Sequence, residues 1–137
     1  MKTSCDEGQT TILVVGLALL VFSITGFAID GTRAFLMRRT LQNAADGAAL
    51  AGASELHLPT YYSSAGRIVE LDPDEARTEA LRLLGHRALP AEAQITASRT
   101  RIHVVLSTEV DTTFLAGIGI GSLPVMVGSR AEPLPVP

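Results

Sequence analysis

The sequence predicts an α+β fold: a long N-terminal membrane-spanning helix, its Ala-rich extension, a short helix, and a small antiparallel sheet of about three strands. Three observations indicate this order. An uncharged apolar run of twenty residues stands near the N-terminus, and a stretch rich in alanine with helical spacing follows it. In the last third of the chain, apolar and polar residues alternate with a period of two, which is typical of strands.

The apolar run covers residues 10–29 (TTILVVGLALLVFSITGFAI) and contains no charged side chain. A helix rises about 1.5 Å per residue, so this run is about 30 Å long, the thickness of the hydrocarbon core of a bilayer. We therefore predict a transmembrane helix over 10–29, after a short N-terminal tail over 1–9. The alternative is a signal peptide cut after Ala28, because Gly26-Phe27-Ala28 has the small-x-small pattern of a cleavage site.

The helix is predicted to continue beyond the membrane as an Ala-rich extension over 30–58, because the next proline is Pro59. Small residues recur on it at steps of four. Such spacing lets two helix backbones approach closely. We interpret these residues as a helix-packing interface for a partner helix, the alternative being that alanine, the best helix former, fills an exposed helix. The small-residue stripe consists of Ala44, Ala45, Ala48, Ala49, Gly52 and Ala53.

Polar positions on the same helix are candidate contact sites. Asp30 stands where the helix leaves the membrane, and Arg33 lies three residues later, so the two side chains can pair across one turn. Either they are solvated at the interface or they pair with a neighbouring subunit. Asp46 lies near the small-residue stripe, where it either faces solvent or makes an inter-subunit contact with an arginine of a partner helix.

A small α+β head domain is predicted over 59–131. Its first part, residues 60–66 (TYYSSAG), is polar and predicts a loop. The motif Asp72-Pro73-Asp74-Glu75 then predicts the start of a second helix, with Asp as the cap, Pro at the first position and Glu three residues after the cap. Pro90 stops this helix.

The remainder of the head domain is predicted to be mostly strands. Alternation over 95–106 predicts two strands joined by a turn at 98–100, and 125–131 predicts a last strand. A short helical turn is expected over 112–118. The tail over 132–137 contains three prolines and is expected to be extended and disordered.

Composition and motifs give no sign of an active site. The net charge of −3, the absence of tryptophan and the aromatic content of 4% provide neither a basic patch nor a stacking surface for nucleic acid. The histidines lie in separate predicted elements, and the single cysteine, Cys5, rules out a cysteine-based metal cage. We expect no enzymatic activity, no cofactor, no metal, no nucleic-acid partner and no small-molecule substrate.

The N-terminal third carries the motifs of a known family. Gly-Gln precedes the span, Ala-Ile-Asp-Gly-Thr-Arg stands at its exit, and Leu-Gln-Asn-Ala-Ala-Asp and Ala-Ala-Leu-Ala-Gly-Ala follow within 41–53. The stretch 7–53 closely resembles the N-terminal region of TadE/TadG-like proteins of the bacterial tight-adherence (Tad/Flp) pilus system. We expect a short, minor-pilin-like member, because the chain has no room for the large additional domain of the long members.

This resemblance implies a non-enzymatic, single-pass membrane subunit of pilus assembly that packs through its long N-terminal helix. Its partners would be other pilus-assembly subunits and the lipid bilayer of the bacterial cytoplasmic membrane, and it would remain there or enter a surface pilus. The resemblance also places the C-terminal domain outside the cytoplasm, although Arg33, Arg38 and Arg39 after the span favour the reverse orientation. The alternative function is a secreted or membrane-anchored small extracytoplasmic binding domain behind a signal peptide.

Processing of the N-terminus is the point where the chain departs from pilins. Pilin precursors are cut after a glycine, which here would be Gly8, before Gln9. Most pilins then carry a glutamate at the fifth mature position, which pairs with the amino terminus of a neighbour. Leu13 stands at that position and supplies no carboxylate. We therefore expect an uncut membrane anchor or a minor subunit rather than a major, repeating pilin.

Overall fold

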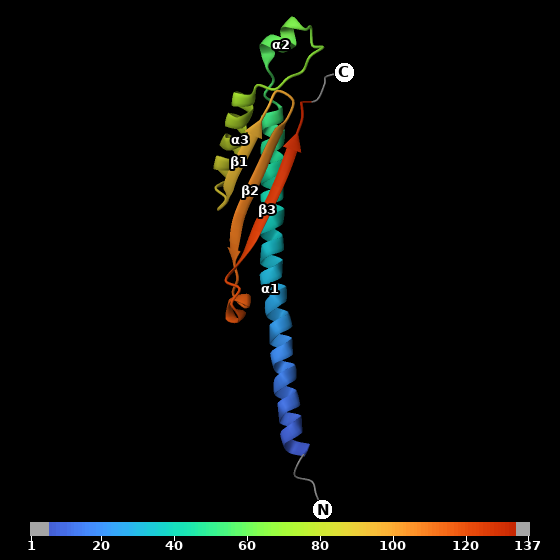
Figure 1. Ribbon diagram of the computed structural model, residues 1–137, viewed down its shortest axis with the longest axis vertical. Coiled ribbons are helices and arrows are strands. Elements are labelled where there is room, and N and C mark those ends of the chain that lie inside the picture. Colours follow the sequence, from blue (N-terminus) through green and yellow to red (C-terminus); the bar gives the residue numbers. More distant parts are fainter. Residues whose placement is uncertain (1–5, 134–137) are drawn as a thin grey trace, which may run out of the picture. The chain divides into compact units, whose positions relative to one another are not determined.

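The computed structural model describes residues 6–133 of the 137-residue chain. Cys5 and the end of the tail, 134–137, lie outside the described residues. The predicted α+β class is confirmed: a long helix and shorter helices accompany a three-stranded antiparallel sheet of order β1-β2-β3 (Figure 1). The elements are α1 (Asp6–Ala53), α2 (Leu58–Ser63), α3 (Pro73–Arg87), β1 (Glu92–Ala97), β2 (Ile102–Asp111), the 3₁₀ turn η1 (Leu115–Ile118) and β3 (Ser122–Ala131).

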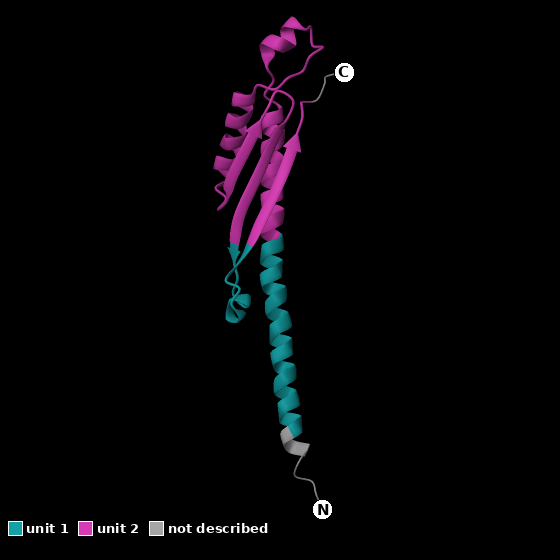
Figure 2. Cartoon of the chain, viewed as in Figure 1, with its two compact units in different colours: residues 1–35, 110–123 teal, residues 36–109, 124–137 magenta. Residues whose placement is uncertain are grey.

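The chain forms two compact units, which are coloured separately in Figure 2. Unit 1 consists of residues 1–35 and 110–123, and unit 2 consists of residues 36–109 and 124–137. The helix α1 contributes to both units. In this division the segment between β2 and β3 groups with the first part of α1, and the boundaries expected after residues 29 and 58 stay predictions.

In unit 1, α1 is apolar and exposed over most of its length. Every residue from 9 to 25 is exposed. Of the most apolar stretch of 18 residues in the helix, 6% is buried. The hydroxyls of Ser23 and Thr25 donate to the carbonyls of Leu19 and Val21, each at 2.8 Å. These bonds satisfy the hydroxyls within the helix itself, which suits a helix in an apolar environment.

In unit 2, the second part of α1 lies in a hydrophobic core with α3 and the sheet. The strands alternate buried and more exposed residues, as the period of two predicted. Burial of apolar side chains is the main favourable term in folding, so this core stabilises unit 2. Its fully or almost fully buried members beyond α1 are Leu71, Ala76, Ala80, Ile95, Ile102, Val104, Leu106, Val125 and Val127.

Two local predictions are confirmed in detail. The carboxylate of Asp72 accepts hydrogen bonds from the backbone N–H groups of Asp74 (3.1 Å) and Glu75 (3.2 Å), so α3 begins at Pro73 as the capping motif indicated. The β1–β2 hairpin turns where expected, because the Ser98 N–H donates to the Arg101 carbonyl at 2.8 Å.

Other boundaries differ from the prediction. The helix α1 ends at Ala53 instead of near residue 58, and α2 occupies much of the segment expected to be a loop. Proline is tolerated in the first turn of a helix, so Pro59 stands in the first turn of a new helix that begins at Leu58. The His57 ring caps this helix by accepting from the Thr60 N–H. The strand β3 begins at Ser122 rather than 125 and includes Pro124, which an edge strand accommodates.

Candidate functional site

The small-residue stripe lies in the interior of unit 2. A Cβ atom added to Gly52 would lie 2.7 Å from the carbonyl oxygen of Ala76 in α3 and would collide with the side chain of Ile102 in β2. The close approach therefore takes place within the chain, against α3 and the sheet. The sequence led us to expect a partner helix at this stripe, but α3 and the sheet of the same chain already cover it. All six residues of the stripe are buried: Ala44, Ala45, Ala48, Ala49, Gly52 and Ala53.

Asp46 lies on the exposed side of the same helix. Its Oδ1 accepts a hydrogen bond from Gln42 Nε2 at 2.9 Å, and the same Gln42 nitrogen lies 3.4 Å from the Gly128 carbonyl of β3. Asp46 thus orients the Gln42 side chain, which reaches the sheet of the same unit. A contact between Asp46 and an arginine of another subunit stays a prediction.

The most strongly bonded carboxylate is that of Asp30 in unit 1. It is only 1% exposed and accepts three backbone hydrogen bonds: from Thr113 to Oδ1 at 3.0 Å, and from Phe114 and Leu115 to Oδ2 at 2.8 Å each. These donors precede or begin η1, whose own N-cap residue, Phe114, provides no side-chain cap. Asp30 therefore caps this turn from a different element of the fold.

Arg33 acts on the same loop instead of pairing with Asp30. Its Nη1 donates to the Thr113 hydroxyl at 2.8 Å. A salt bridge of the described part of the chain joins Glu79 and Arg82, in α3. Asp30 and Arg33, predicted as a polar pair, thus lie together but hold neighbouring atoms of the loop at residues 112–121, which we call the β2–β3 loop.

The hydrogen bonds also fix the charge of Asp30, which follows the predicted span. The backbone N–H groups of Leu115 and Thr113, and then that of Phe114, hold the pKa of Asp30 below its ordinary value of 3.8 against the opposing effect of burial, and the charge of Arg33 adds to them. The carboxylate is therefore ionised at neutral pH. A buried carboxylate charge without such hydrogen-bond donors would be costly.

Sequence reasoning singled out Asp30 and missed its partner. No motif in the β2–β3 loop connects it to a residue 83 positions earlier. The contact extends beyond the carboxylate: a Cβ atom added to Gly26 would lie 2.6 Å from Phe114 Cβ, so the Phe114 side chain packs directly on the helix backbone. Gly26 is required here because any larger residue would displace Phe114.

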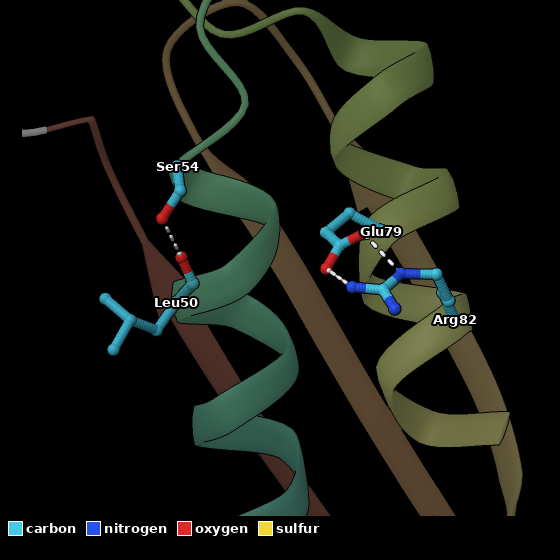
Figure 3. Close-up of polar contacts among 4 residues, drawn as sticks. All are labelled: Leu50, Ser54, Glu79 and Arg82. Carbon is cyan, nitrogen blue, oxygen red and sulfur yellow. Dashed lines mark hydrogen bonds and ion pairs between the residues drawn. The ribbon is translucent and has the colours of Figure 1, made fainter. Parts of the chain in front are cut away.

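Other polar contacts serve the helices themselves. Ser54 Oγ donates to the Leu50 carbonyl at 3.1 Å, and Arg82 donates twice to Glu79 at 2.6 and 2.7 Å (Figure 3). The first contact lies at the C-terminal end of α1, where Ser54 follows the last helical residue, and the second lies within α3. Among the residues that the structure describes, no group of three or more His, Cys, Asp or Glu side chains could hold a metal ion.

Fold and contacts together define an α+β protein whose N-terminal helix is long and apolar enough to cross a membrane, and whose loop is held to that helix by a buried carboxylate. Residues 8–55 match the family model described as putative Flp pilus-assembly TadE/G-like. The match covers most of α1 and supports the resemblance: over these residues the chain is similar to TadE/G-like Flp pilus-assembly proteins. No curated protein and no solved structure was found to match the chain.

Proposed function

We propose that the protein is a non-enzymatic, single-pass membrane subunit of Flp pilus assembly, acting as a minor pilin or as a membrane-anchored assembly factor. The observation that carries this proposal is the first part of α1, which is apolar and exposed on all sides over residues 9–25 within the region that matches the family. A helix that is apolar all round needs lipid or other helices around it.

The burial of the small-residue stripe gives the two parts of α1 different roles. Since the small-residue stripe packs in the core of unit 2, we assign contacts with other subunits to the membrane part of the helix. Its outer surface consists of bulky side chains such as Phe22 and Phe27, which are 72% and 65% exposed. In this proposal the helix packs in the membrane or in the base of a fibre, and the C-terminal domain is outside the cytoplasm.

The loop contacts argue against cleavage after Ala28. Gly26 and Asp30 stand on opposite sides of that peptide segment, and both contact the β2–β3 loop within unit 1. Removal of residues 1–28 would take away the surface on which Phe114 packs. A cut between Gly8 and Gln9 would leave these contacts intact, so the proposal holds for the uncut chain and for the chain processed there.

Photo-crosslinking in piliated cells tests the proposal. A photoreactive residue replaces Phe22 in α1, and a matched variant carries it at Tyr62 of α2, which is equally exposed but lies outside the span. We expect a crosslink from position 22 to another pilus-assembly subunit and loss of pili when the gene is deleted. Normal piliation of the deletion strain, together with position 22 crosslinking only to lipid, would refute a role in assembly.

A further inference from the structure

The β2–β3 loop exposes large apolar side chains. Phe114, Ile118 and Ile120 are 48%, 74% and 43% exposed, and no charged residue occurs between Asp111 and Arg130. Clustered exposed side chains of this kind mark an interaction site. The loop belongs to unit 1 together with the apolar part of α1.

The contact with Gly26 sets the level of this loop along α1. Gly26 lies three residues before the end of the predicted span at residue 29, which corresponds to about 5 Å of helix. Phe114 packs on Gly26, and Asp30 at the span's exit binds the backbone of the same loop. If residues 10–29 cross the membrane, the loop therefore lies at the boundary between headgroups and acyl chains.

The backbone of the loop is suited to that boundary. Unsatisfied N–H groups are expensive in an apolar medium, and irregular backbone is excluded from lipid for this reason. Here seven N–H groups have acceptors within the loop or on Asp30, and the Thr112 hydroxyl donates to the Ile120 carbonyl. The seven donors are those of Thr112, Thr113, Phe114, Leu115, Gly117, Gly119 and Ile120.

We propose that the β2–β3 loop is a second membrane contact, which inserts Phe114 and Ile118 into the lipid interface beside the exit of α1. The inference rests on the proposed function in one respect, namely that residues 10–29 span the bilayer. Aromatic and branched apolar side chains favour this zone, where the loop's backbone can also reach water. The buried carboxylate of Asp30 then ties the inserted loop to the transmembrane helix.

The absence of tryptophan allows a direct test, because a single introduced tryptophan is the only indole in the protein. The full-length chain is reconstituted in phosphatidylcholine vesicles whose acyl chains carry bromine either near the glycerol end or near the methyl end. Three variants are compared: Ile118→Trp in the loop, Leu17→Trp in the span, and Tyr62→Trp in α2. All three original side chains are more than half exposed.

We expect the tryptophan of Ile118→Trp to emit at a shorter wavelength than that of Tyr62→Trp. Bromine near the glycerol end should quench it more than bromine near the methyl end, because the loop is proposed to lie at a depth of about 5–10 Å. Tyr62→Trp should be unaffected by either lipid. An unquenched Ile118→Trp beside a strongly quenched Leu17→Trp overturns the inference and leaves the span in place; such a loop faces water or another subunit. If Leu17→Trp is also unquenched, the span itself is refuted, and the loop insertion with it.

Discussion

Two glycines of α1, Gly47 and Gly52, allow the packing of the small-residue stripe to be tested by single methyl groups. A Cβ atom on Gly52 would meet the Ala76 carbonyl oxygen at 2.7 Å, closer than real Cβ atoms approach backbone. A Cβ atom on Gly47 would meet only the ends of side chains, that of the flexible Arg87 at 3.4 Å and that of Leu83 at 3.8 Å, which is ordinary van der Waals contact. The substitutions Gly52→Ala and Gly47→Ala therefore add the same atom to the same helix in opposite environments.

The expected effects differ in sign. Overpacking of a well-packed core costs about 1–3 kcal/mol, and replacing a helical glycine by alanine returns at most about 1 kcal/mol. Because the Ala76 oxygen belongs to the backbone and cannot move aside cheaply, we take the upper part of this cost, about 2–3 kcal/mol, and expect a net loss of about 1–2 kcal/mol for Gly52→Ala. A domain of this size changes its midpoint by about 4–8 °C per kcal/mol, so unit 2 should melt roughly 4–16 °C lower. Gly47→Ala should leave the midpoint unchanged or raise it by a few degrees.

The measurement is thermal unfolding of the full-length protein in detergent micelles, followed by circular dichroism. Hydrogen exchange of the Ile102 and Val104 amides provides a second readout, because both residues lie in the buried part of β2. Faster exchange in Gly52→Ala alone would agree with the packing described. If both alanine variants unfold at the same temperature, Gly52 does not face α3, and the small-residue stripe is available to a partner helix after all.

The remaining predictions concern the charges and the topology. Asp30→Asn replaces one of the two carboxylate oxygens by an amide NH2, so at least one of the three backbone N–H groups loses its acceptor and meets a donor instead, and hydrogen exchange of the loop amides should speed up. Asp46→Asn, at an exposed carboxylate of the same helix, should not have this effect; equal rates in both variants would contradict the capping role. Arg82 lowers the pKa of Glu79 from 4.5, chiefly through its hydrogen bonds, so this ion pair stabilises α3 above pH 4.5 and loses its effect as pH falls through the lower folded value. The unfolding midpoint of Glu79→Gln should accordingly lie slightly below that of the wild type at neutral pH and low salt, and the gap should close in acid; a gap that persists in acid would assign the effect to packing. Cys5 should resist a membrane-impermeant maleimide in intact cells if the C-terminal domain is extracytoplasmic, and efficient labelling of uncut protein would reverse the topology.

Local signals in the sequence predicted local structure well. The start of α3 follows from Asp72 and Pro73, whose chemistry acts within one turn. The β1–β2 turn follows from the polar break at 98–100 between two runs that each alternate with a period of two. The break between α1 and α2 was missed because a proline can end one helix or begin another, and Pro59 stands in the first turn of the second.

Contacts between residues far apart in the sequence could not be predicted from sequence patterns. A stripe of small residues indicates that something packs closely against a helix, but an intramolecular sheet and a partner helix require the same side chains. Asp30 was recognised as unusual because it is a charge at the end of an apolar run. Its partners are backbone N–H groups, which every residue except proline possesses, so no side-chain pattern in the loop identified them.

The central claim is that α1 keeps its apolar first part and holds the protein in the membrane. Membranes are washed with alkaline carbonate, and the intact mass of the retained protein is measured. We expect retained protein with the mass of the full chain, 14.4 kDa, or of the chain that begins at Gln9, since both keep residues 10–29. Protein that begins at Ile29, or full-length protein released into the wash, would contradict the account.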